Sequence, residues 1–180
     1  AFIGVTVPFQ TFYELLGWRV ADPFDTVAKL IEQLSEKVDA IVLLSHLGIS
    51  DDEKMAHMFP QLTAILGGHT HHVFEHGKRV NETLLCGAGK FAQYVGCLTL
   101  SIDKNSRKVE SCAYVQHTDA LEHECAETKQ KLNHMIEQAT NALAQPIVHL
   151  PEPLHMDWFS PSPFASLLAQ ALNEWCEGDI

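Results

Sequence analysis

The chain has 180 residues, 46% of them hydrophobic and 19% charged, which is the composition of one ordinary folded domain. It contains no apolar run near the roughly 18 residues that a membrane helix needs, so a membrane span is not expected. Twelve Lys and Arg residues stand against 23 Asp and Glu residues, and the net charge of -11 disfavours binding to a nucleic-acid polymer.

The chain opens with strand-like and helix-like segments in alternation. Residues 2–7 are a strand-like run, and because a native protein rarely begins inside a strand we expect residues upstream of Ala1. Asp22-Pro23 is typical of a helix start, and apolar residues at helical spacing continue to Val38. The continuous apolar run 40–44 predicts a parallel strand buried on both faces.

A second helix and a third strand continue this alternation. Asp51-Asp52-Glu53 places negative charge at the start of a short helix, which Pro60 ends. Residues 64–66 then form another buried strand. The order strand, helix, strand, helix, strand predicts an α/β fold with a parallel sheet, in which ligands bind beyond the carboxyl ends of the strands. His46 and His69 follow two of those strand ends.

The pattern changes after Val73 to shorter alternating runs. Residues 83–86, 94–103 and 108–116 predict antiparallel strands that extend the sheet. Helical spacing returns from Cys125 to Leu143.

The last part of the chain combines a linker with a helix. The segment from Pro146 to Pro163 holds five prolines and is typical of a linker. A helix with one apolar face, residues 164–175, follows it. That apolar face has no partner within the chain, which leaves self-association open.

The motif Gly67-Gly68-His69-Thr70-His71-His72 directly follows a buried strand. Two histidines one residue apart on a tight loop can direct their imidazoles at one or two neighbouring metal ions, and the glycines let the backbone approach a ligand closely. His46 follows a second strand at the same sheet edge, so we expect three imidazoles, from His46, His69 and His71, to converge there. Solvated or backbone-bonded histidines are the alternative interpretation.

Other known arrangements fit less well. A metallo-β-lactamase motif would need Asp and His where the chain has Val73 and Phe74. An amidohydrolase barrel needs about 250 residues, which excludes a complete barrel but leaves an amidohydrolase fragment open. The glycine-rich run 87–90 is followed by Phe91 and is not a P-loop. It is either a turn between strands or a loop that lines the metal cleft.

The chain resembles the metallophosphoesterase (calcineurin-like) superfamily, in its bacterial 5'-nucleotidase and 2',3'-cyclic phosphodiesterase branch. Four segments carry the resemblance: 3–6, 43–48, 67–71 and 87–96. It implies the second half of a sheet-and-helix sandwich, with parallel and then antiparallel strands. It also implies a centre of two divalent ions, Zn or Mn, in which His46 and His69 bind one ion and His71 the other.

The chain also departs from the family pattern. The family blocks Asp-x-His, Gly-Asp-x-x-Asp and Gly-Asn-His-Asp/Glu do not occur in these 180 residues. The resemblance therefore implies an internal fragment whose catalytic residues lie upstream of Ala1. It assigns residues 1–145 to the catalytic domain and residues 146–180 to the linker and opening helix of a substrate domain. That helix has Ala165-Ser166 and Gln170 where the family has Gly-Asn and Asp, and the substrate-binding residues are not identified.

The resemblance predicts a parent enzyme that hydrolyses phosphate esters of small molecules, with nucleotides as substrates and nucleotide catabolism as the role. We expect the chain alone to be inactive, because half of the metal ligands are missing. A non-enzymatic, His-rich metal-binding or assembly module is the alternative. Five widely spaced cysteines without a Cys-x-x-Cys pair favour a reducing, cytoplasmic location.

Overall fold

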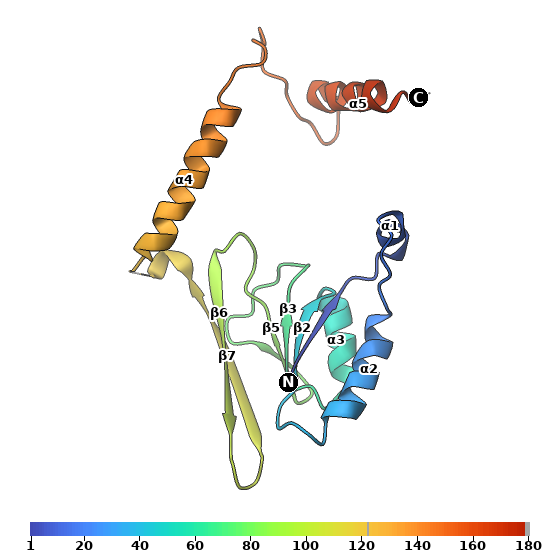
Figure 1. Cartoon of the computed structure of the whole chain (residues 1–180), viewed down its shortest axis with the longest axis vertical. Helices are drawn as coiled ribbons and strands as arrows, with labels where there is room; N and C mark the ends of the chain where they lie inside the picture. The colour runs from blue at the N-terminus through green and yellow to red at the C-terminus, as the bar shows by residue number, and fades with distance from the viewer. Residues whose placement is uncertain (122, 179–180) are drawn as a thin grey trace. The chain divides into compact units, whose positions relative to one another are not determined.

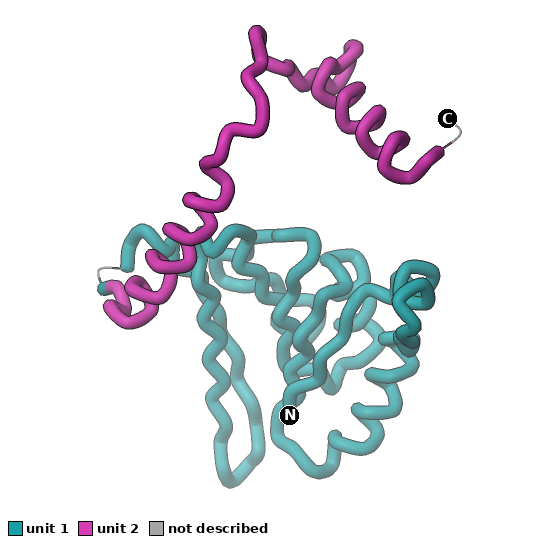
Figure 2. Tube along the Cα trace, turned by 45° about the horizontal axis from the view of Figure 1, so that its top comes forward, with its two compact units in different colours: residues 1–123 teal, residues 124–180 magenta. Residues whose placement is uncertain are grey.

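The structure is a computed structural model that describes residues 1–121 and 123–178. The chain divides into two compact units, Ala1–His123 and Glu124–Ile180 (Figure 2). Unit 1 holds both sheets and the histidines of the predicted site. The predicted domain boundary at residue 145 remains a proposal.

A five-stranded sheet forms the centre of unit 1, in the order β1-β2-β3-β5-β4. Its strands are β1 (Phe2–Thr6), β2 (Val42–His46), β3 (Ala64–Gly67), β4 (Lys78–Val80) and β5 (Thr83–Cys86). The first four in spatial order are parallel, and only β4 runs antiparallel to its neighbour. The mixed α/β fold is confirmed. Residues 83–86 were predicted to extend the sheet as an antiparallel strand, but they pair antiparallel only with β4 and lie parallel to β3. Residues 68–82 connect the end of β3 to the start of β5 at the opposite edge of the sheet, so the two strands run parallel.

Two helices, α2 (Pro23–Leu34) and α3 (Ile49–Met58), cover one face of this sheet (Figure 1). Asp22 caps α2 by accepting hydrogen bonds from the backbone N–H groups of Phe24 and Asp25 at 2.9 and 3.0 Å. The apolar side of each helix meets the apolar strands in one core cluster, which includes Val27, Ile31, Leu43, Met55 and Ile65. This packing holds the carboxyl ends of β2 and β3 in place.

A long hairpin, β6 (Tyr94–Ile102) and β7 (Val109–His117), forms a separate two-stranded sheet. The prediction that these strands extend the main sheet is wrong. Strand β4 occupies the free edge of β5, so the hairpin packs across the sheet face that α2 and α3 leave open. A second core cluster there joins Val42, Ala64 and Leu84 of the sheet to Leu98 and Ala113 of the hairpin.

Short elements complete unit 1. The sequence pattern did not predict helix α1 (Gln10–Leu15), strand β4 or the 3-10 turn η1 (Thr118–Ala120). The guanidinium of Arg79 on β4 donates to the backbone carbonyl of Ser111 on β7 at 2.6 Å, which ties the two sheets together.

Unit 2 consists of α4 (Ala126–Leu143) and α5 (Pro163–Cys176), with no helix or strand between them. Ser162 caps α5 by accepting a hydrogen bond from the N–H of Ala165 at 3.3 Å. The apolar side chains of both helices are largely exposed. Within residues 1–121 and 123–178, no helix is both long and apolar enough to cross a membrane.

Candidate metal centre

His46 and His69 meet at the carboxyl edge of the parallel sheet. Strand β2 ends at His46, and β3 ends at Gly67, two residues before His69. The parallel register places Ser45 opposite Gly67, and the N–H of Gly68 donates to the carbonyl of Ser45 at 2.8 Å. As a result, Nε2 of His46 lies 3.4 Å from Nδ1 of His69, with the ring centroids 5.0 Å apart.

Two glycines leave the room that these rings occupy. A Cβ at Gly68 would lie 3.1 Å from Nδ1 of His46. A Cβ at Gly48 would lie 3.3 Å from Cδ2 of His69 and 3.0 Å from Cγ2 of Thr70, and the φ of +100° at Gly48 also disfavours any L side chain. The glycines in the predicted motifs therefore make space for imidazoles.

The two facing nitrogens suit a divalent metal ion. A tetrahedral ion bound to two imidazole nitrogens at about 2.0–2.1 Å holds them about 3.3–3.4 Å apart. The observed 3.4 Å matches that separation. Without an ion the same contact is a weak hydrogen bond in which one ring donates and the other accepts. The His46–His69 pair is therefore a suitable two-ligand edge of a metal site.

His71 lies two residues after His69 in the same loop and is exposed. Its φ is +55° and that of His69 is +50°, so the backbone turns sharply between the two. Within the described part of the chain, no three His, Cys, Asp or Glu residues form a group that could hold a metal ion. The structure thus brings together two of the three predicted imidazoles, and the ligand roles of His46, His69 and His71 remain predictions.

A buried carboxylate lies directly under this edge. Asp52 on α3 is only 2% exposed, and its Oδ1 accepts a hydrogen bond from the hydroxyl of Ser45, the residue before His46. Burial raises the pKa of the Asp52 carboxyl group, the Ser45 hydrogen bond lowers it, and the neighbouring charge of Asp51 raises it further; the net change is upward.

Sequence reasoning missed the burial of Asp52, because acidic residues at a helix start are usually solvated and interact favourably with the helix dipole. The helical spacing nevertheless indicates that Asp52 is buried. Asp52 shares one face of α3 with Met55, Ala56 and Phe59, and all three are apolar. A carboxylate on the apolar face of a helix next to a strand end indicates a specific buried partner.

Thr70, in the loop that carries His69, ties that loop to α3. Its hydroxyl oxygen accepts a hydrogen bond from the N–H of Ile49, the first residue of α3, at 3.0 Å. The Nδ1 of His72 lies 3.0 Å from the same oxygen, and the ring of His72 stacks on Phe74. The start of α3 and the histidine loop therefore form one connected unit.

The glycine-rich run after β5 lies along the end of this loop. The N–H of Gly89 donates to the carbonyl of His72 at 3.1 Å, and the N–H of Phe74 donates to the carbonyl of Gly87 at 3.1 Å. A Cβ at Gly87 would lie 2.5 Å from the carbonyl oxygen of His72, so only glycine fits there. The run is a strand-to-strand connection that supports the segment after His71.

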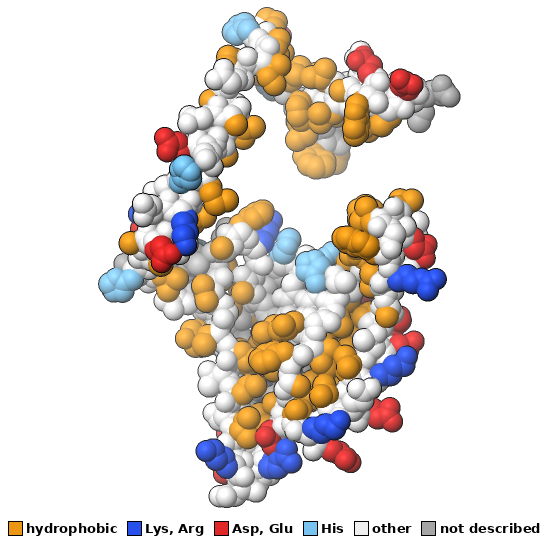
Figure 3. Space-filling view, in the orientation of Figure 1, with side chains coloured by type: hydrophobic (Ala, Val, Ile, Leu, Met, Phe, Trp, Pro, Cys, Tyr) orange, Lys and Arg blue, Asp and Glu red, His pale blue; other side chains and the backbone are white. Residues whose placement is uncertain are grey.

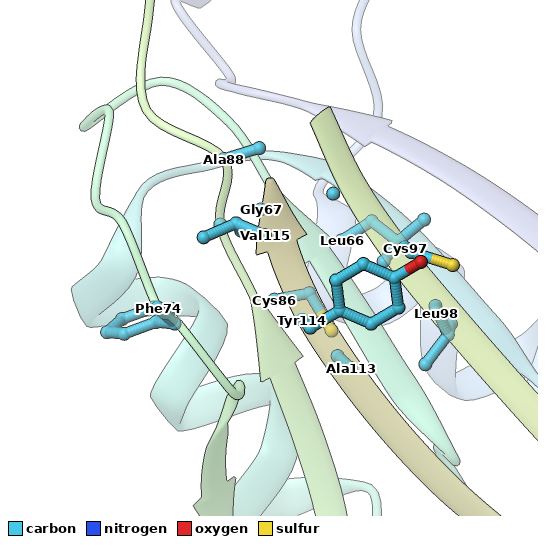
Figure 4. A pocket seen from close by; sticks show the side chains of 12 residues that line it. Leu66, Gly67, Phe74, Cys86, Ala88, Cys97, Leu98, Ala113, Tyr114 and Val115 are labelled. Carbon is cyan, nitrogen blue, oxygen red and sulfur yellow. The ribbon is translucent and has the colours of Figure 1, made fainter. Parts of the chain in front are cut away.

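An apolar cavity lies elsewhere, between the main sheet and the β6–β7 hairpin (Figure 4). It has a volume of about 210 Å³, and Leu66, Phe74, Leu98 and Tyr114 are among its lining residues. None of the three predicted ligands lines it. Burial raises the pKa of the Cys86 thiol in its wall to about 11, so this thiol is a poor nucleophile near neutral pH.

Two curated proteins of Bacillus subtilis strain 168 are similar to the chain. It is 42% identical over 181 residues to a protein named uncharacterized metallophosphoesterase YunD, and the match covers 100% of the chain and 39% of that relative. It is 29% identical over 119 residues to trifunctional nucleotide phosphoesterase protein YfkN, with 62% of the chain and 8% of that relative covered. The chain thus spans about two fifths of the first relative and a small part of the second. No protein-family model matches it.

Solved structures share the fold. A protein of Staphylococcus aureus named as a candidate 5'-nucleotidase, in complex with alpha-ketoglutarate, superposes with a TM-score of 0.74 at 21% identity, over 98% of the chain and 39% of that protein. The sulfate thiohydrolase SoxB of Thermus thermophilus, in complex with glycerol, gives a TM-score of 0.66 at 20% identity, over 98% of the chain and 33% of that protein. At these identities the likeness is one of fold.

Proposed function

We propose that this chain, which belongs to the metallophosphoesterase superfamily, supplies one side of a divalent-metal centre in a longer enzyme that hydrolyses phosphate esters. The observation that carries the proposal is the 3.4 Å separation between Nε2 of His46 and Nδ1 of His69, at the sheet edge where α/β proteins bind ligands. Both curated relatives are named for phosphoesterase chemistry, which favours this proposal over the amidohydrolase alternative.

In this proposal His46 and His69 bind one ion and His71 binds its neighbour, with Zn or Mn as the metals. Bound divalent ions would supply Lewis acidity toward a phosphoryl oxygen and activate a water for attack. The chain's own contribution is to present the imidazoles in a fixed orientation, because Gly48 and Gly68 make room for the rings. The carboxylate ligands come from other parts of the longer protein.

We propose nucleotides as the substrates, because one relative is named a nucleotide phosphoesterase. The 180-residue chain alone is proposed to be inactive, since within its described residues the two facing imidazoles have no third ligand beside them. A cytoplasmic location also stays a proposal. It agrees with the five free cysteines, Cys86, Cys97, Cys112, Cys125 and Cys176.

Metal titration tests the proposed centre. Zn²⁺ and Mn²⁺ are titrated into the chain and into single His46→Ala, His69→Ala and His71→Ala variants, with His76→Ala as a control. His76 is exposed and lies in the same region of unit 1. We expect each of the first three substitutions to weaken binding at least tenfold and the control to leave it unchanged. Equal binding by all variants would favour the non-enzymatic, His-rich module.

Activity is tested on both lengths of protein. The full-length parent, loaded with Mn²⁺ or Zn²⁺, is expected to release phosphate from nucleotides, and the chain alone is not. Metal-dependent hydrolysis by the chain alone would contradict the proposed division of ligands.

A further inference from the structure

The carboxylate of Asp52 connects the two turns that carry the histidines. Its Oδ1 accepts a hydrogen bond from the hydroxyl of Ser45, and the same hydroxyl oxygen accepts one from the N–H of Leu47 at 3.2 Å. These two bonds hold the residues on either side of His46. Because successive side chains along β2 point to opposite sides, anchoring Ser45 below the edge directs the ring of His46 toward His69.

The other carboxylate oxygen lies under the second turn. A Cβ at Gly67 would be 2.6 Å from Oδ2 of Asp52, a distance that real Cβ atoms do not adopt. The carboxylate therefore occupies the space that a side chain at Gly67 would take, two residues before His69. One buried carboxylate thus accepts a hydrogen bond at the end of β2 through Oδ1, while its Oδ2 fills the space beside Gly67 at the end of β3.

The burial of this charge is costly. A carboxylate that is 2% exposed loses most of its hydration, and the serine hydroxyl replaces only part of it. An apolar side chain would fill the same space at lower cost, as Met55 and Ala56 do on the same face of α3. What the carboxylate adds is an acceptor for the Ser45 hydroxyl at the end of β2, together with a second oxygen that fills the space beside Gly67 at the end of β3.

From these contacts we infer that Asp52 is a positioning residue that holds His46 and His69 at the separation a divalent ion requires. It acts through Ser45 and through the backbone of Gly67, and it does not bind the ion itself. The inference deepens the proposed function and uses the same two imidazoles, but the contact between the rings can be measured without any metal.

The first test measures the contact between the rings in the metal-free chain. Nuclear Overhauser effects between the ring protons of His46 and His69 are recorded for wild type, Asp52→Asn and Ser45→Ala. Asp51→Asn is the matched control. It removes the same charge one residue away, from an exposed side chain that pairs with Lys54 at 2.7 Å.

We expect the ring-to-ring signal to be lost or strongly reduced in Asp52→Asn and Ser45→Ala and kept in Asp51→Asn. Backbone amide spectra report whether each variant is folded. Should Asp52→Asn unfold, Ser45→Ala still decides, because it removes only one hydroxyl group. A folded Asp52→Asn or Ser45→Ala variant with the wild-type ring contact would overturn the inference.

The second test measures affinity for Zn²⁺ by competition with a chelating dye. Loss of a group that orients metal ligands costs about 10- to 100-fold in metal affinity. We expect a loss in this range for Asp52→Asn and a change of less than about twofold for Asp51→Asn, since an exposed charge is screened by solvent. If wild type binds no Zn²⁺, the proposed function fails while the ring contact still decides the role of Asp52.

A third variant separates position from charge. Gly67→Ala keeps the carboxylate but places a methyl group where Oδ2 of Asp52 lies. It is expected to weaken Zn²⁺ binding as Asp52→Asn does. In Asp52→Ala the obstructing oxygen is absent. The double variant Asp52→Ala with Gly67→Ala should therefore bind Zn²⁺ as tightly as Asp52→Ala alone. If the two substitutions lowered Zn²⁺ affinity independently and additively, Asp52 and Gly67 would not act through the same contact.

Discussion

Nε2 of His46 lies 3.4 Å from Nδ1 of His69, although 23 residues separate them along the chain. Parallel pairing of β2 with β3 accounts for this proximity, because it brings the carboxyl ends of both strands to the same edge. Figure 3 shows histidine side chains at this rim of unit 1, with hydrophobic side chains over α1 beside them and more hydrophobic side chains lower on the sheet. Both imidazoles are thus exposed at this edge, whereas Leu43 and Ile65 in the strands below are buried.

Crowding this edge should weaken metal binding. In Gly68→Ala the new methyl group would lie 3.1 Å from Nδ1 of His46, so the ring must shift by a few tenths of an ångström. We expect a loss of Zn²⁺ affinity of about three- to tenfold, because ligand orientation controls affinity. Gly4→Ala, where a Cβ meets nothing within 4 Å, is the control. Equal affinity of the two variants in a dye-competition assay would mean that the ring position is not critical.

Alanine substitutions at two adjacent leucines of β2 should lower the free energy of unfolding by very different amounts. Leu43 is fully buried against α2 and α3, whereas Leu44 is 43% exposed on the opposite face. Leu43→Ala should lower the free energy of unfolding by about 2–5 kcal/mol, the usual cost of a core cavity. Leu44→Ala should cost less than about 1 kcal/mol. Urea unfolding of both variants checks this difference, and similar midpoints would contradict the assignment of the core face.

The sequence predicted the elements whose pattern is long and regular. The strand before His46 and the helix after Asp22 could be predicted without tertiary information. Consecutive apolar residues indicate the buried strand, and the Asp-Pro pair indicates the start of the helix. The metallophosphoesterase resemblance is confirmed by the 42% identity over the whole chain.

Other features depended on packing that no local pattern records. A short apolar run such as Thr83–Cys86 looks the same in a parallel and an antiparallel sheet, so its direction was misjudged. The strand Lys78–Val80 is too short and polar to stand out. Asp52 resembled a solvated charge at a helix start, because its burial follows only from where α3 meets the strand ends.

The cysteines should differ in their reactivity. Burial raises the pKa of the Cys86 thiol to about 11, whereas hydrogen bonds from the Thr128 hydroxyl and backbone lower the pKa of the exposed Cys125 thiol. Because the thiolate is the nucleophile, a lower pKa gives a larger reactive fraction at pH 8. Cys125 should react fastest with iodoacetamide and Cys86 slowest, as measured by peptide mass spectrometry.

A substitution at Thr128 checks the cause of this difference. Thr128→Val removes the hydroxyl and should slow alkylation of Cys125 while leaving Cys176, which is also exposed, unchanged. Rapid alkylation of Cys86 in the folded chain would show that its thiol is more accessible than its position in the sheet implies.

Thr70 should stabilise α3 from outside that helix. Gly48 occupies the N-cap position and has no side chain to accept a hydrogen bond, so the hydroxyl of Thr70 accepts one from Ile49 N–H instead. Thr70→Val removes this acceptor and should lower the free energy of unfolding by about 1 kcal/mol, as loss of an N-cap does. Thr70→Ser keeps the hydroxyl and should retain most of the stability. If the valine variant unfolds at the wild-type urea concentration and the serine variant at a lower one, the methyl group of Thr70, and not its hydroxyl, supports the loop that carries His69.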